Sequence, residues 1–89
     1  MLLNPYNFIL ENYRMSIVQS IVFNKSYGLK NARAWLAKNG YGSHYVDEKE
    51  ETYRFRQYDP SSLENHGYRF RTTPFEHGNL IIAYPPEKK

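Results

Sequence analysis

The spacing of apolar residues changes along this chain, and each spacing predicts one kind of element. Residues 16–23 are dominated by apolar and β-branched residues, which predicts a strand with both faces substantially covered. Over residues 28–39 the apolar residues fall on one helical face, which predicts a helix. That face consists of Leu29, Ala32, Trp35 and Leu36. Gly40 follows as a residue suited to the left-handed conformation that ends many helices.

The second half of the chain alternates apolar and polar residues with a period of two, as half-buried strands do. Residues 52–58 and 68–72 show this pattern. Residues 80–84 are apolar throughout and are expected to form a final strand, and residues 44–46 are a further short candidate. The spacing therefore predicts three late strands with short connections, which is typical of an antiparallel meander.

Proline interrupts this alternation and predicts breaks. Asp59-Pro60 is expected to end one strand and to open a polar loop that reaches Gly67. Thr73-Pro74 is expected to end the next strand, because proline cannot donate a hydrogen bond to a neighbouring strand.

The predicted order of elements is β-α-β-β-β, with the short candidate strand placed after the helix. We therefore predict an α+β fold of two layers, in which an antiparallel sheet of three to five strands is covered on one face by a single helix. Residues 1–15 are expected to be an N-terminal arm or extension, residues 16–84 a single domain, and residues 85–89 a charged tail.

The tetrapeptide Tyr-Arg-Phe-Arg occurs twice, at residues 53–56 and 68–71. On a strand, alternation sends the rings of each copy to one face and the arginines to the other. If the two strands are neighbours, the rings pack beneath the helix and the arginines form one basic patch on the opposite face. This candidate site for an anion or a partner consists of Arg54, Arg56, Arg69 and Arg71. The alternative is that nearby acids such as Glu50, Glu51 and Asp59 balance these charges.

Composition narrows the classes of function. The 89 residues allow one small core, and nine Tyr and five Phe supply much of it. The chain has no cysteine, and its net charge of +3 permits an anionic partner without requiring one. The histidines stand in separate segments, and neither a nucleophile elbow nor a phosphate-binding loop is present. We therefore expect no enzyme, no catalytic residue, no metal, no cofactor and no small-molecule substrate.

The first segment is apolar but fits neither a secretory signal nor a membrane span. It has no basic leader, and Pro5 and two asparagines interrupt a run far shorter than the roughly 20 apolar residues that a span needs. We expect a protein that is not secreted and does not enter a membrane. The segment is instead a candidate arm for docking on a partner, through Leu2, Leu3, Tyr6, Phe8, Ile9 and Leu10.

Five short motifs together carry a resemblance to a known family. They are residues 18–26 (VQSIVFNKS), 32–36 (ARAWL), 39–41 (NGY), 46–48 (VDE) and 53–60 (YRFRQYDP). Across residues 16–84 the chain resembles a small domain that is widespread in tailed bacteriophages and has relatives in other large DNA viruses. Those relatives carry threonine where this chain has Gly28, and they begin near Met15. The resemblance brings with it no activity and no catalytic residue.

The resemblance implies a viral protein that acts in the virion or inside the host cell, with other viral proteins as partners. Our hypothesis is a non-enzymatic structural or protein-interaction module, such as a minor virion or capsid component or an assembly factor. The alternative is a small nucleic-acid-binding protein that uses the arginine face together with Lys25, Lys30 and Arg33.

Overall fold

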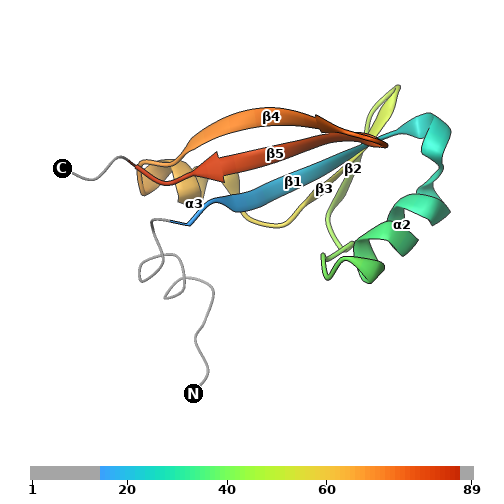
Figure 1. Ribbon diagram of the computed structural model, residues 1–89, viewed down its shortest axis with the longest axis horizontal. Coiled ribbons are helices and arrows are strands. Elements are labelled where there is room, and N and C mark those ends of the chain that lie inside the picture. The colour runs from blue at the N-terminus through green and yellow to red at the C-terminus, as the bar shows by residue number, and fades with distance from the viewer. Residues whose placement is uncertain (1–14, 87–89) are drawn as a thin grey trace, which may run out of the picture.

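Residues 15–86 are described by the computed structural model, and they form an α+β fold with one antiparallel sheet (Figure 1). The strands are β1 (Ile17–Asn24), β2 (Val46–Glu48), β3 (Thr52–Arg56), β4 (Arg69–Phe75) and β5 (Gly78–Tyr84). The helices are the 3-10 helix η1 (Lys25–Tyr27) and the α-helices α2 (Leu29–Lys38) and α3 (Pro60–Asn65). The predicted α+β class is confirmed.

The strands lie in the order β2-β3-β1-β5-β4, so β1, the most deeply buried strand, is central. It pairs antiparallel with β3 on one side and with β5 on the other. A β-bulge interrupts the pairing with β5 between Val18 and Ser20. Close to β1, the hairpin between β4 and β5 needs Gly78, because a β-carbon there would collide with the carbonyl group of Val22. The two edges of the sheet are β2 and β4.

Helix α2 covers one face of the sheet through a group of side chains that we call the α2 cluster. Its fully buried members are Ile21, Phe23, Ala32, Leu36 and Phe55. The helix ends as its sequence predicts, because Gly40 takes a positive φ of 82° and the N–H of Tyr41 donates to the carbonyl of Leu36 at 2.8 Å. The Tyr41 ring then stacks on Trp35, with 6.0 Å between ring centres.

A second group of side chains, the α3 cluster, lies on the opposite face. Its buried members are Ile17, Leu63, Tyr68 and Ala83, with Phe70 and Tyr58 packed against them. Strand β5 shows that the two clusters lie on opposite faces. Leu80 packs in the α2 cluster, and Ala83 of the α3 cluster is an odd number of residues further along the strand, so its side chain points to the other face. Figure 1 shows α2 and α3 near opposite ends of the sheet.

Two expectations about proline are wrong. Residues 60–65 form helix α3 rather than a loop, because Asp59 accepts a hydrogen bond from the N–H of Ser61 at 3.1 Å and Pro60 occupies the first helical position. Strand β4 also continues through Pro74 to Phe75. It can do so because β4 is an edge strand, where a residue without an N–H group can face away from the sheet.

Candidate functional site: the two arginine pairs

The two copies of Tyr-Arg-Phe-Arg lie on strands that are not neighbours. The first copy is in β3, the second enters β4, and both β1 and β5 lie between them. The four arginines therefore do not form the single patch that was expected if the two strands were neighbours. The repeat supplies two separate arginine pairs, Arg54 with Arg56 and Arg69 with Arg71.

The two pairs also lie on opposite faces of the sheet. One row of facing residues runs across the strands and consists of Phe55, Ile21, Leu80 and Thr73. Arg54 and Arg56 flank Phe55 in sequence, so alternation places them on the face opposite to this row. Arg69 and Arg71 precede Thr73 by even numbers of residues and therefore share its face. The expectation of a single basic face is wrong, because the register places the two copies in opposite orientations.

The first pair lies beside an acid of the neighbouring strand. Asp47 of β2 faces Arg54 in the register, and its carboxylate lies 3.2 Å from the guanidinium group of Arg56. Both partners of this ion pair are about half exposed, so it contributes at most about 1 kcal/mol to stability. For Arg56 the charge is therefore balanced within the protein, as the alternative expected, although the acid is Asp47 and not Glu50, Glu51 or Asp59.

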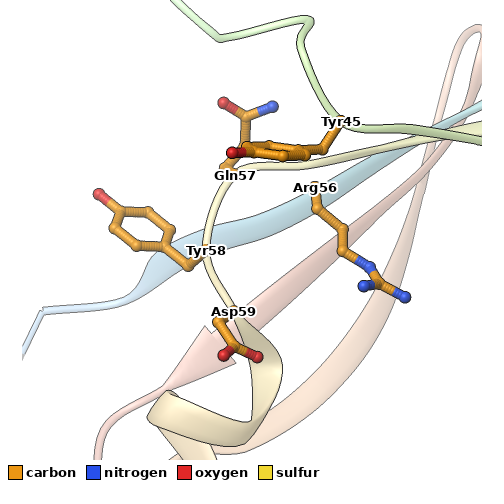
Figure 2. Close-up of a pocket in the computed structure, with 5 residues that line it drawn as sticks. All are labelled: Tyr45, Arg56, Gln57, Tyr58 and Asp59. Carbon is orange, nitrogen blue, oxygen red and sulfur yellow. The ribbon is translucent and has the colours of Figure 1, made fainter.

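A pocket of about 410 Å³ borders this first pair and is lined by Tyr45, Arg56, Gln57, Tyr58 and Asp59. Its polar groups have structural roles. The Gln57 amide accepts from the N–H of Gly42 at 2.8 Å and donates to its carbonyl at 2.9 Å, and Asp59 caps α3. Figure 2 shows Arg56, Tyr58 and Asp59 pointing in different directions. The polar side chains of the pocket therefore do not converge on one point.

The second pair has a different environment. Arg69 and Arg71 are both exposed, and the guanidinium group of Arg71 lies 5.6 Å from the centre of the Tyr84 ring. Among residues 15–86, no carboxylate forms an ion pair with either arginine. A hollow of about 390 Å³ is lined by Arg69, Phe70, Arg71 and Tyr84. This pair presents two positive charges and an aromatic ring to solvent.

The aromatic residues of the repeat are divided between the two clusters. Phe55 is fully buried in the α2 cluster, with Tyr53 packed against it, as predicted. Tyr68 and Phe70 belong instead to the α3 cluster, so the expectation that both copies lie beneath one helix is wrong. The Tyr68 side chain is 4% exposed, and its hydroxyl has no hydrogen-bond partner among residues 15–86. Burial raises the pKa of this hydroxyl above its ordinary value.

Several side chains that position these elements escaped the sequence analysis. Gln19, at the β-bulge, donates to the carbonyl of Tyr58 at 2.8 Å and receives a bond from Ser20 at 2.9 Å. His77 stacks on Tyr27 at 3.9 Å between ring centres and so ties the β4–β5 hairpin to η1. The sequence carries no local signal for the roles of Gln19 and His77. It does carry one for helix α3, since Asp59-Pro60-Ser61-Ser62 is a helix-start pattern.

The remaining expectations concern metals, membranes and the first segment. Within residues 15–86, no group of three or more His, Cys, Asp and Glu side chains is placed to hold a metal ion. In the same part of the chain, no helix is long and apolar enough to span a membrane. The candidate docking arm of Leu2, Leu3, Tyr6, Phe8, Ile9 and Leu10 lies outside the described residues.

Comparison of the chain with models of protein families, with curated proteins and with solved structures found no match.

Proposed function

We propose that this protein is a non-enzymatic protein-interaction module of a virus, acting as a minor virion component or as an assembly factor. The viral context rests on the resemblance of residues 16–84 to the bacteriophage domain. The interaction role rests on the face of the sheet that carries Arg69 and Arg71 of β4. There, Arg69 and Arg71 are exposed beside Tyr84, with no intramolecular carboxylate to balance them among the described residues.

The second pair has the composition of a protein-binding surface. Arginine and tyrosine are enriched where proteins contact one another, since both provide a large rigid contact area together with hydrogen bonds. An arginine that stacks on an aromatic ring is also partly ordered before the partner arrives, which lowers the entropic cost of binding. Arg71 and Tyr84 form such a pair.

Nucleic acid is the alternative partner, and the geometry favours it less. A protein that binds the sugar-phosphate backbone of DNA or RNA gains affinity by neutralising many phosphates with basic residues on one face. Here the four arginines are divided between two faces, and Arg56 is paired with Asp47. Each face therefore offers only two arginines of the repeat, which is a weak basis for phosphate binding.

The test places a photoreactive amino acid at Thr72, which is exposed on β4, and at Ala37, which is exposed on α2. Particles and assembly intermediates of the virus that encodes the chain are irradiated, and cross-linked peptides are identified by mass spectrometry. We expect one viral protein to be cross-linked from Thr72 and not from Ala37. Absence of the protein from both particles and intermediates would overturn the proposal. So would salt-sensitive binding of DNA or RNA that requires both arginine pairs.

A further inference from the structure

The open edge of β4 suggests how a partner binds. We propose that this edge accepts an extended acidic segment of a partner protein as an added β-strand. In that complex, Arg69 and Arg71 contact two acidic side chains at positions i and i+2 of the segment. The inference rests on the proposed function and specifies the chemistry of its partner.

The backbone of β4 is available for such pairing. Pro74 faces Asn79 in the register and has no N–H group, so its nitrogen lies at a position that points away from β5. Hydrogen bonding in an antiparallel pair alternates along the strand, so the N–H and C=O groups of Phe70 and Thr72 also point outward. Among the described residues no further strand pairs with this edge. An incoming strand therefore meets two consecutive sets of free backbone groups.

Pro74 also limits where that strand can lie. It offers no donor on the outer edge, so pairing is favoured beside Phe70 and Thr72 and weakened toward the hairpin turn. This places the added strand next to Arg69 and Arg71. The same proline protects the rest of the edge from extended pairing, which is how natural edge strands avoid aggregation.

The charges of β4 select the side chains of the incoming strand. Arg69 and Arg71 are two residues apart, so they lie on one face of the sheet. A strand added beside β4 places its own alternate side chains on that face, with facing β-carbons about 4.5–5.5 Å apart. Acids at positions i and i+2 then meet both guanidinium groups. Both arginines are exposed, and both line the hollow that β4 shares with Tyr84 of β5, so their guanidinium groups are accessible to such side chains.

A second copy of the chain fits this edge less well than an acidic partner does. The other edge strand, β2, is acidic but has only three residues, Val46–Glu48. Its acids are already engaged, Asp47 with Arg56 at 3.2 Å and Glu48 with Lys25 at 2.7 Å. Pairing of β2 with β4 of another copy would compete with both ion pairs.

The experiment titrates the isotopically labelled full chain with a blocked peptide, Thr-Val-Glu-Val-Glu-Val-Thr, and records amide NMR spectra. Binding should shift the amides of Phe70 and Thr72 and protect them from hydrogen exchange. One matched peptide replaces both Glu by Gln, and another places the two Glu side by side, which sends them to opposite faces. The Gln peptide should bind more weakly by roughly 2- to 30-fold, since two cross-strand charge pairs are lost, and the peptide with adjacent Glu by roughly 1.4- to 5-fold, since one Glu still faces an arginine.

Substitutions in the protein provide the matched controls. Arg69→Gln with Arg71→Gln should weaken binding by the same factor, whereas Arg54→Gln with Arg56→Gln on the other face should leave it unchanged. Thr72→Pro removes one outward N–H group and should abolish binding, whereas Thr72→Ala keeps that group and should not. If the spectrum of Thr72→Pro is that of an unfolded chain, the arginine variants decide.

Three results would overturn the inference. They are peptide binding that is indifferent to Arg69 and Arg71, dimerisation through β4 without peptide, and equal occupation of the site by a single-stranded oligonucleotide. If the peptide does not bind but Thr72 cross-links to a viral protein in particles, this inference fails while the proposed function stands. If the peptide binds but the protein is absent from particles and intermediates, the proposed function fails instead.

Discussion

The first copy of Tyr-Arg-Phe-Arg lies on β3, which pairs with β2 on one side and β1 on the other, whereas the second copy enters β4 at the edge of the sheet. In the first copy Phe55 is fully buried and Arg56 is paired with Asp47. In the second copy Phe70 is partly exposed, and the guanidinium group of Arg71 meets only the Tyr84 ring among its identified contacts.

The comparison shows that topology decides the role of an identical motif. A strand inside a sheet has neighbours on both sides, and one of them supplies the acid that neutralises its arginine. A strand at the edge has one neighbour, so both its backbone and its charges remain available on the other side. Phe55 and Arg56 are therefore structural in β3, whereas their counterparts Phe70 and Arg71 in β4 are candidates for recognition.

The largest difference is expected between the two phenylalanines. Phe55→Ala should destabilise the protein by about 3–5 kcal/mol, because it empties the centre of the α2 cluster. Phe70→Ala should cost about 1–2 kcal/mol, because only part of the ring is buried. Chemical unfolding followed by Trp35 fluorescence measures both values. Equal losses would show that the edge copy is as deeply embedded in the core as the interior copy.

The sequence predicted the class of the fold and the helix, because these depend on periodicity within short segments. Residues 28–39 and the end of the helix at Gly40 are examples, where local spacing and one glycine were sufficient. Helix α3 was missed, although Asp59 followed by Pro60 is a helix-start signal as well as a strand-stop signal. The choice between the two depends on whether Leu63 finds a buried site, which is a tertiary contact.

The candidate site was predicted less completely for a related reason. The arginines themselves were identified, and periodicity correctly placed the Phe55 ring in the core. Periodicity cannot give the order of strands, and here β1 and β5 insert between β3 and β4. Whether two strands present the same face depends on that order and on the register. The prediction of one patch therefore failed at the step that requires long-range pairing.

The tyrosines of the two copies give the next smaller effect. Tyr68→Phe should stabilise the protein by about 1 kcal/mol, because it removes a buried hydroxyl that has no partner in the described part of the chain. Tyr53→Phe is the matched change in the first copy. Tyr53 is partly exposed, with the ammonium group of Lys25 5.2 Å from its ring centre, so this change should alter stability by less. Thermal unfolding at neutral pH compares the two variants.

The same pair of variants separates the two tyrosines by pH. Because burial raises the pKa of Tyr68 in the folded state, the unfolded chain loses this proton first as the pH rises above about 10. The ionisation of Tyr68 therefore leaves the free energy of unfolding unchanged below that pH and lowers it as the pH rises toward the folded-state pKa. Tyr68→Phe should lose part of this alkaline decline, whereas Tyr53→Phe, which retains Tyr68, should keep it. An identical decline in the two variants would contradict the burial of Tyr68.

The smallest effect concerns the acid that distinguishes the two arginine pairs. In a double-mutant cycle, Asp47→Asn and Arg56→Gln should show a coupling energy of roughly 0.2–1 kcal/mol, because their ion pair is half exposed. Asp47→Asn combined with Arg71→Gln should show no coupling, since these residues lie at opposite edges of the sheet. Added salt should reduce the first coupling. Equal coupling in both cycles would mean that Asp47 acts through the overall charge of the protein, and the local contrast between the two copies would then disappear.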